Sequence, residues 1–436
     1  MKRNLKIKTK VYKEVFVYIF STLLFLVPVL VTSSSHVASI GFYLGCLCVL
    51  LYKKDIRYLI FYFSIIALNP YLMYVQMYPL SITVTSIIRM FPIAILVCEL
   101  LIRPNLILDR KIIISFGFLC IWIFYFCMNS YLHNLSVYKI LWISTILLYC
   151  LLLELLVLQN EKFRNDLLIC LFVAAFITAL VAYIELINKS TFFYSLWAGE
   201  RYRNGIFRVG STQGDPNTMS MYLVPLIFIF STSKFRNLLG STFVNICNLL
   251  LIILVFVSGS RTSLVALIIS FGILLVYKNK KVERILFLLF CILVILMLPV
   301  IFDFFTSIDI ASTGQRLKLV FDALGLWKNH LFTGIGFDQF YQSTQWMVMN
   351  EFVKQLTEFG IIGFTFYLLY WFQCYFRLFF VRKRIKIKTI KSHDNIYLAS
   401  ALTSWCINSC SMDSFYHYIA WIMPALVILF QVEEEV

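Results

Sequence analysis

Apolar runs of 16 or more residues recur along the whole chain, separated by short polar segments. A helix needs ~20 residues to cross the hydrocarbon of a bilayer, and only helices satisfy so much buried backbone there. The pattern therefore predicts an all-α, polytopic integral membrane protein with about 12 to 14 transmembrane helices. The runs lie near residues 15–31, 37–52, 57–72, 80–102, 112–130, 138–158, 167–187, 217–232, 242–258, 262–277, 285–301, 356–376, 396–411 and 415–431.

The composition agrees with this pattern. The chain is 61% hydrophobic and 14% charged, whereas a soluble domain carries roughly 25% charged residues. Its net charge of +16 comes from basic residues that gather on one set of alternate loops. With the N-terminus inside, 27 of the 38 Lys and Arg are cytoplasmic, ten are external, and Arg89 lies within a span. The charge therefore predicts topology and gives no indication of nucleic-acid binding.

This topology divides the chain into five parts. N-terminal transmembrane helices occupy 1–187, central ones 217–301, and C-terminal ones 356–436. Two external loops, 188–216 and 302–355, lie between them. Neither loop is long enough for a domain with its own core, so both are expected to lie against the membrane helices. Long ordered loops in compact proteins are usually functional.

The second external loop contains one strongly amphipathic segment. Its apolar residues repeat at three- and four-residue spacing, and charged residues occupy the other faces. This predicts a helix suited to the bilayer interface, with a simple structural strut as the alternative. The apolar positions are Leu317, Val320, Phe321, Leu324 and Trp327, and the charged ones are Arg316, Lys318, Asp322 and Lys328.

A small polar turn, residues 258–263, separates two apolar runs and contains an arginine. Arg236 and Lys278 are both cytoplasmic and 41 residues lie between them, so two crossings of ~20 residues leave almost no loop. Arg261 is therefore expected at head-group depth, where a charge is costly and usually functional. It also begins the outgoing helix, whose free N–H groups attract anions. With Ser260, it predicts a phosphate site; a capped hairpin with a snorkelling arginine is the alternative.

The first external loop carries three arginines, Arg201, Arg203 and Arg208, against the charge rule. An external anionic ligand accounts for them and for the cations of the second loop, with lipid head groups as the competing ligand. Asp215-Pro216-Asn217, which follows, is typical of ordinary helix capping.

Several segments together resemble the O-antigen ligase and polymerase superfamily, specifically the Wzy-type polysaccharide polymerases. The resemblance covers roughly residues 200–365, while the first half is similar only as a hydrophobic multi-span chain. The matching segments are RNGIFRVGSTQGDPN (203–217), SGSRTSLVAL (258–267), TGQR (313–316), NHLFTGIGFDQF (329–340) and MNEFVKQLTEFGIIGF (349–364).

The resemblance implies a GT-C-like glycosyltransferase that needs neither metal nor cofactor. It would pass a glycan from an undecaprenyl diphosphate donor to a sugar hydroxyl, on the outer side of the bacterial cytoplasmic membrane, beside a flippase and a chain-length regulator. Arginines would stabilise the diphosphate leaving group. The residues expected at the diphosphate are Arg261, Arg203, Arg208, Arg316 and Ser260, and those expected at the glycan are Asp338, Asn350 and Glu351.

The chain departs from the ligase pattern at one position. Ligases typically have His-Asn at the start of the helix that this chain begins with Met349-Asn350, and that histidine is the proposed base. Methionine cannot accept a proton, so the departure favours a polymerase over a ligase. It also leaves the proton acceptor open.

Two groups are the candidates for this catalytic role. Glu358 matches a glutamate of the family and lies on one helix face with Glu351 and Lys354. A buried carboxyl at the outer membrane edge would be suited to accept a hydroxyl proton, although an ion pair between Lys354 and Glu358 is equally open. The other candidate is His417, four residues after Asp413.

Two other functions remain open at this point. A flippase for lipid-linked oligosaccharides would need a polar path through both leaflets, but intramembrane charge is sparse. A ligase would pass finished glycan to another acceptor. The 12 cysteines all fall within predicted spans, which indicates buried thiols and neither a disulfide framework nor a zinc site.

Overall fold

The computed structural model describes eleven stretches of the chain. They are residues 2–31, 34–73, 75–77, 82–103, 110–132, 137–190, 202–203, 206–278, 310–380, 392–412 and 417–432. Within them, strands are confined to two antiparallel pairs of two-residue strands. The first pair is β1 (Gln76–Met77) with β2 (Ile82–Thr83), and the second is β3 (Tyr202–Arg203) with β4 (Ile206–Phe207). The prediction of an all-α, multi-span chain is confirmed.

The helices follow one another with short connections. The N-terminal part contains α1 (Lys2–Val31), α2 (Ser35–Lys53), η1 (Ile56–Tyr58), α3 (Leu59–Ala67), α4 (Pro70–Met73), α5 (Val84–Ile102), α6 (Arg110–Leu132), α7 (Val137–Gln159) and α8 (Glu161–Asn188). The central part contains η3 (Ser211–Gln213), α9 (Pro216–Phe230), α10 (Ser233–Leu239), α11 (Ser241–Val257) and α12 (Arg261–Lys278). The C-terminal part contains α15 (Ile310–Lys328), α16 (Gln339–Thr344), α17 (Glu351–Phe380), α18 (Ser392–Ser409) and α19 (Tyr418–Val432).

Five of the described helices are long and apolar enough to cross a membrane: α1, α2, α5, α8 and α17. A sixth span is formed if α9 and α10, bent by 83° at the break between them, are taken together. Six shorter apolar helices accompany these, at 56–67, 116–129, 144–159, 241–257, 261–275 and 418–430. The predicted span at 285–301 lies outside the described residues, so the count of 12 to 14 stays a prediction.

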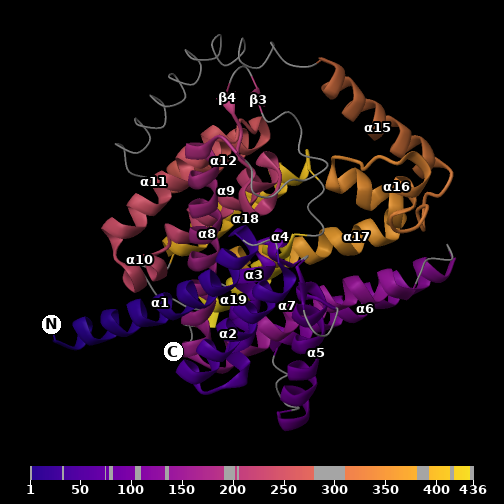
Figure 1. Cartoon of the computed structure of the whole chain (residues 1–436). Coiled ribbons are helices and arrows are strands. Elements are labelled where there is room, and N and C mark those ends of the chain that lie inside the picture. The colour runs from indigo at the N-terminus through magenta and orange to yellow at the C-terminus, as the bar shows by residue number, and fades with distance from the viewer. Residues whose placement is uncertain are drawn as a thin grey trace.

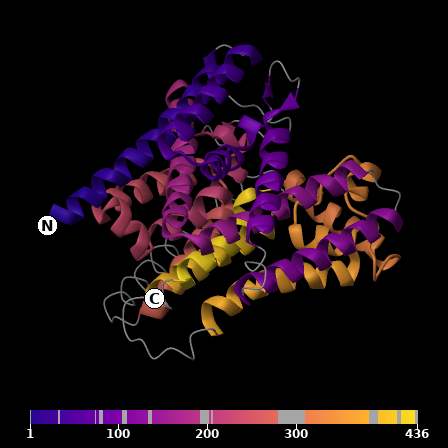
Figure 2. The same cartoon turned by 90° about the horizontal axis from the view of Figure 1, so that it is seen from below.

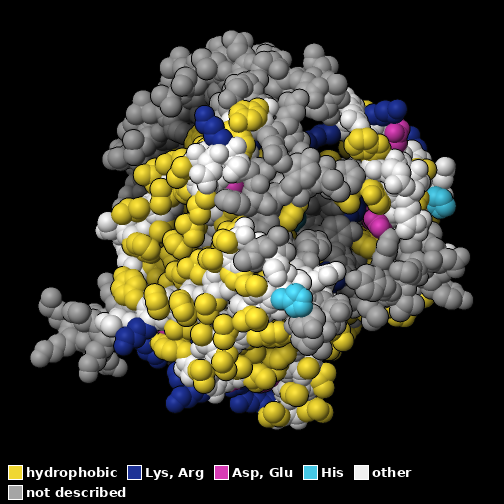
Figure 3. Space-filling view, in the orientation of Figure 1, with side chains coloured by type: hydrophobic (Ala, Val, Ile, Leu, Met, Phe, Trp, Pro, Cys, Tyr) yellow, Lys and Arg dark blue, Asp and Glu magenta, His cyan; other side chains and the backbone are white. Residues whose placement is uncertain are grey.

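The centre of the bundle is formed by α7, α8, α9, α18 and α19. Helix α19 packs on α7, and α18 packs on both α9 and α12. Apolar side chains on all sides of α9 are buried, as expected for a helix enclosed by others. The hairpin of α1 and α2 lies at one side of this centre, and α6 runs along α17 at the other (Figures 1 and 2). Hydrophobic side chains cover much of the surface near the first helices, with basic residues at its lower edge (Figure 3).

Helix α18 corresponds to the predicted span at 396–411 but is not among the apolar spanning helices. Its buried positions include Ser400, Ser404 and Asn408, which repeat every four residues along one face. The hydropathy pattern predicted a lipid-crossing helix, whereas the structure encloses a polar helix between α9 and α12. Polar side chains are costly against lipid, which explains why this helix takes a central place.

The predicted amphipathic helix is present as α15, and it packs on α16 and α17. The face that it buries there differs from the predicted apolar face. Leu319 and Ala323 are enclosed in a small separate core with Phe340. Leu317 and Phe321 of the predicted face remain 54% and 68% exposed. Helix α15 therefore has two apolar sides, one against the protein and one available to the bilayer interface that the sequence analysis expected.

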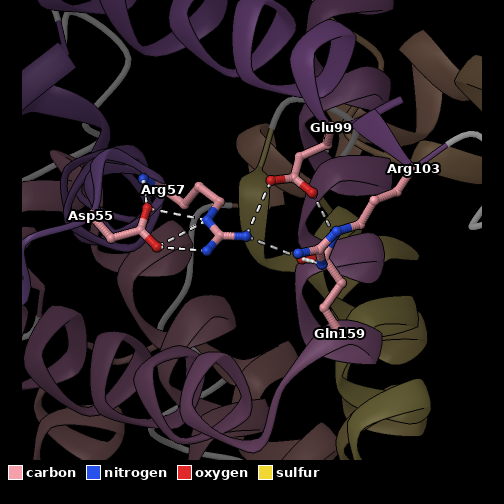
Figure 4. A network of polar contacts seen from close by, with 5 residues as sticks. All are labelled: Asp55, Arg57, Glu99, Arg103 and Gln159. Atoms are coloured by element: carbon pink, nitrogen blue, oxygen red, sulfur yellow. Dashed lines mark hydrogen bonds and ion pairs between the residues drawn. The ribbon is translucent and has the colours of Figure 1, made fainter. Parts of the chain in front are cut away.

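A polar clamp ties together the ends of α5 and α7 and the start of α3. It consists of Asp55, Arg57, Glu99, Arg103 and Gln159 (Figure 4). The Arg57 guanidinium pairs with Asp55 at 2.6 Å and with Glu99 at 3.2 Å. The Gln159 amide donates to Glu99 at 2.8 Å and its oxygen accepts from Arg103 at 3.2 Å. Three segments far apart in the sequence are thereby fixed at one end of the bundle.

Candidate functional site

The polar turn between α11 and α12 is tight, as the residue count predicted. Helix α11 ends at Val257 and α12 begins at Arg261, so only three residues connect them. Gly259 has a φ of +63°, a conformation that glycine adopts without the strain of a side chain. The backbone N–H of Ser260 donates to the Ser258 hydroxyl at 3.2 Å. The turn therefore places Arg261 at the N-terminal end of α12, as predicted.

The segment that precedes α9 is buried. The sequence analysis expected all of 188–216 to be an external loop, but residues 209–213 are enclosed among α4, α8 and α9. The backbone N–H of Ser211 donates to the Glu185 carboxylate at 2.8 Å, and the Gln213 amide donates to the Leu68 carbonyl at 2.7 Å. Small and polar residues make this possible, because they can satisfy backbone groups inside the bundle. The segment forms a plug that holds Arg208 and Asp215 in fixed positions.

Arg208 joins this plug to the polar turn. The side chain is only 7% exposed. Its Nε donates to the Ser258 carbonyl at 2.7 Å, and its Nη2 donates to the Asn217 side-chain oxygen at 2.9 Å. Both acceptors are neutral oxygens, and these two bonds fix the orientation of the guanidinium. Asp215 caps α9 as predicted, accepting from the N–H groups of Asn217 and Thr218.

Three helices meet around the hydroxyl of Ser263. That oxygen accepts from Ser220 of α9 at 2.8 Å and from Ser260 at 3.1 Å. It donates in turn to the Asn408 side-chain oxygen of α18 at 2.7 Å. We call Ser220, Ser260, Ser263 and Asn408 the serine cluster, and all four are buried. Arg261 lies between Ser260 and Ser263 in the sequence, and it is half-buried.

The start of α17 is attached to the same end of α18. Asn350 caps α17 by accepting from the Val353 N–H at 3.0 Å, and its amide donates to the Cys410 carbonyl at 2.8 Å. Cys410 follows Asn408 by two residues, so α17 begins beside the serine cluster. Asn350, expected at the glycan, has a capping role in this structure. The predicted polar stripe is present, because Glu351, Lys354 and Glu358 share the first segment of α17 and are buried.

Helix α17 is broken at Gly360, where φ is +65° and ψ is −172°. The loop before α16 pairs with this break, because Ile335 N–H donates to the Thr357 carbonyl and Gly336 N–H to the Glu358 carbonyl. A Cβ on Gly360 would lie 2.3 Å from the Phe332 oxygen, so the close approach requires glycine. The span predicted at 356–376 is thus interrupted at Gly360, near the end expected to lie outside. Asp338 follows the same loop and begins α16 with a φ of +61°.

The remaining predicted residues lie outside this assembly or outside the described side chains. Arg316 is exposed on α15. Arg203 lies in β3, but its side chain is not described, and Arg201 and Asp413 fall outside the described residues. His417 directly precedes α19, and the centroid of its ring lies 6.2 Å from that of Trp405. Trp405 in turn lies one helical turn before Asn408 on α18. The structure therefore joins Arg208 to the polar turn that contains Ser260 and Arg261, and attaches Asn350 to the end of α18 that carries Asn408. A contribution of Arg203 and Arg316 stays a prediction.

Sequence reasoning missed three residues of this assembly. Ser220 and Asn408 lie within apolar runs, and Gln355 lies between the predicted carboxylates of α17. Polar residues recur at four-residue spacing along α18, and this spacing was the signal that could have found Asn408. An average of hydropathy over the whole helix hides it. A count of polar positions on each helix face would have found it.

Comparison with known families bears on the central part of this assembly. Residues 246–368 match the family model described as O-antigen ligase. The match contains the polar turn, α15, the loop before α16 and the broken part of α17, but it ends before Asn408 and begins after Arg208. The predicted resemblance to the O-antigen ligase and polymerase superfamily is confirmed. A search of curated proteins finds no match. The family match and the apolar helices together indicate a multi-pass membrane protein with a function of the O-antigen ligase and polymerase type.

Proposed function

We propose that this chain is a metal-independent glycosyltransferase that polymerises lipid-linked oligosaccharide repeat units into a surface polysaccharide. The observation that carries the proposal is the bond from Arg208 to the polar turn, which contains Arg261 and two members of the serine cluster, inside a bundle of apolar helices. The family match includes this turn and the segments that follow it, up to residue 368. Undecaprenyl diphosphate is the donor carrier that this superfamily resemblance implies.

The chemistry of a diphosphate leaving group suits this arrangement. When the bond between the sugar and the diphosphate breaks, negative charge develops on the phosphate oxygens. Preorganised cations at that position stabilise the transition state more than the ground state. Guanidinium groups bind two phosphate oxygens at once, and the free N–H groups at the start of α12 favour an anion. Arg261 is the primary contact in this proposal, with Ser260 beside it and Arg203 and Arg316 as further contacts.

The distribution of charge supports an active site on the extracytoplasmic side. The polar clamp and the basic ends of α2 and α10 belong to segments that the charge rule assigns to the cytoplasmic end of the bundle. Helix α8 runs from that end to Glu185, which contacts the plug. A lipid-linked oligosaccharide on the outer leaflet carries its diphosphate at the head-group depth proposed for Arg261.

The acceptor would bind toward the start of α17. Glu351 and Glu358 are the buried carboxylates available there as proton acceptors, with His417 as the alternative. Met349 stands where ligases have their histidine, which favours a polymerase over a ligase. A ligase remains the second candidate, because the matching family model is described by that name. In a polymerase pathway, a flippase would deliver the donor and a chain-length regulator would act beside this protein.

Incubation of the purified protein, in lipid nanodiscs, with a lipid-linked repeat unit tests the proposal. A ladder of products with increasing repeat number supports a polymerase. Transfer of one glycan to an added lipid or protein acceptor, with no ladder, would assign a ligase. An unchanged donor that appears on the opposite leaflet of a sealed vesicle would assign a flippase and contradict glycosyl transfer.

A further inference from the structure

Gln355 is a buried residue of α17 to which neither the motifs nor the family resemblance give a role. Its side-chain nitrogen donates to one carboxylate oxygen of Glu351 at 2.7 Å. The two residues are four positions apart, so their side chains lie one above the other on the same helix face. Both are fully enclosed. An amide donor at this distance restricts the rotation of the carboxylate.

The oxygen of the same amide has no hydrogen-bond partner among the described residues. A buried acceptor that has lost its contact with water raises the free energy of the protein, so such oxygens are normally satisfied. Because an amide oxygen and nitrogen share one carbon, this acceptor lies next to the Glu351 carboxylate. The Glu351 carboxylate and the Gln355 amide oxygen are thus two neighbouring hydrogen-bond acceptors, and the amide oxygen has no partner among the described residues. Such a pair suits a ligand that donates hydroxyl groups.

The position of Glu351 relates it to the proposed diphosphate site. It follows Asn350, which is bonded to the Cys410 carbonyl, and Asn408 is bonded to Ser263. Glu358 lies seven residues further along α17, which is about 10 Å of helix. The backbone carbonyl of Glu358 is held by Gly336 at the helix break. Glu351 is therefore the carboxylate of α17 that comes from the segment attached to the serine cluster.

We infer that Gln355 is a positioning residue that orients Glu351 as the proton acceptor of the transfer reaction, an inference that rests on the proposed function. The acceptor sugar hydroxyl gives its proton to Glu351 while its oxygen bonds to the donor anomeric carbon. The bond between that carbon and the diphosphate oxygen breaks, and its electron pair leaves with the lipid diphosphate. Glu351 then passes the proton to water. The Gln355 amide oxygen accepts from a hydroxyl of the same acceptor sugar.

Other ionisable groups surround this end of α17 and must stay constant in any test. They are Lys354 and Glu358 on α17 itself, Arg316, Lys318, Asp322 and Lys328 on α15, Asp338 at α16, Cys410 after α18 and His417 before α19. A substitution at Gln355 changes none of these charges. The Gln355→Met variant keeps the length of the side chain and removes both hydrogen-bonding atoms.

The test measures kcat, KM for the lipid-linked donor, and the pH dependence of kcat in nanodiscs. Gln355→Met should lower kcat by about 10-fold or more, because a hydrogen bond to a charged group is lost, and leave the donor KM within about twofold. The pH profile of kcat should differ from that of the wild type, because the carboxylate has lost the donor that orients it. Glu351→Gln should bind donor normally and lose turnover.

Gln373→Met is the matched control. Gln373 is also a buried glutamine of α17, on the other side of the break, and no described residue bonds its amide. This variant should keep the wild-type kcat and pH profile. If Gln355→Met also keeps both while the wild type transfers glycan, the inference is overturned and the proposed function stands. If it does not fold, a wild-type rate in Glu351→Gln overturns the inference by itself. A wild-type protein that transfers nothing would contradict the proposed function.

Discussion

Two clusters of charged and polar residues lie at opposite ends of α8, and they hold their cations differently. Near the first turns of α8, Lys53 pairs with Asp166 at 2.6 Å and with Glu14 at 3.3 Å, and Arg57 pairs with Asp55 and Glu99. Asp166 and Glu185 are 19 residues apart, or about 28 Å of helix. Beyond Glu185, Arg208 donates to a carbonyl and an amide oxygen.

The difference separates a structural role from a binding role. A cation that is paired with carboxylates in a half-buried site contributes to the position of the helices, and its field is largely cancelled. The two hydrogen bonds of Arg208 instead fix a guanidinium beside the polar turn, where the proposed diphosphate would bind. The polar clamp therefore belongs to the architecture of the bundle, whereas the arginines beside the serine cluster suit a diphosphate.

The largest expected effect follows from removing Arg261. Arg261→Ala should lower glycosyl transfer by about 100- to 1,000-fold, since a preorganised donor to the leaving group is lost. Arg261→Lys should recover little, because an ammonium cannot bind two phosphate oxygens in one plane. Transfer in nanodiscs and the amount of protein in the membrane are measured together.

Arg103→Ala, in the polar clamp, is the control for the same loss of charge. It should keep transfer within about twofold, because the hydrogen bond from Arg103 to the Gln159 oxygen is exposed to solvent and contributes little. Full activity of Arg261→Ala would show that the arginine only caps the hairpin, and the distinction between the two clusters would fail.

The next prediction concerns the side of the membrane on which each cluster lies. Single cysteines at Arg203 and Gln339, in a background without reactive native thiols, should react with an impermeant reagent in intact cells. A cysteine at Lys54, beside the polar clamp, should react only after lysis. Labelling with the opposite pattern would invert the topology and move the proposed site to the cytoplasm.

A smaller effect is expected from breaking the polar clamp. Glu99 is buried and accepts from Arg57 and Gln159. Glu99→Ala should lower the free energy of unfolding by roughly 1–3 kcal/mol, since it leaves those donors without their acceptor. Thermal unfolding in detergent measures this loss. Transfer per folded molecule should stay unchanged, and a loss of turnover at full stability would give the clamp a role in function.

The smallest effect is the pH dependence of the clamp. Burial would raise the pKa of the Asp55 carboxyl, but hydrogen bonds and charge from Arg57 outweigh it and lower the pKa below its ordinary value. The stabilisation is therefore present above the unfolded pKa of ~3.9 and is lost as the pH falls through the lower folded value. Because the pair is partly exposed, about 0.2–1 kcal/mol is expected. The difference in stability between wild type and Asp55→Asn should shrink from pH 6 to pH 3.

The sequence predicted the elements whose signal is local. The polar turn at 258–263, the Asp215 cap and the amphipathic segment at 316–328 each depend on residues within a few positions of one another. Hydropathy also gave the apolar spans. Arg261 was placed correctly at the start of α12 because the number of residues between Arg236 and Lys278 left no room for a loop.

The features that were missed depend on distant partners. The break at Gly360 exists because the loop at 331–336 supplies the backbone donors that the interrupted helix needs, and no local pattern at Gly360 shows that loop. The burial of 209–213 likewise needs acceptors on α3 and α8. The bond from the Asn350 amide to the Cys410 carbonyl also joins positions sixty residues apart, so no local pattern shows it.

The enclosed polar helix α18 has a consequence for how the protein is made. Chains enter the membrane from the N-terminus during synthesis, so α9 and α12 are inserted long before residue 392 leaves the ribosome. Until then the hydroxyls of Ser220 and Ser263 lack Asn408, to which Ser263 donates in the finished protein. Helices α18 and α19, which occupy the centre, are the last to arrive. The centre of the bundle is thus completed last, and a chain stalled before α18 would expose polar groups to lipid and be a substrate for membrane quality control.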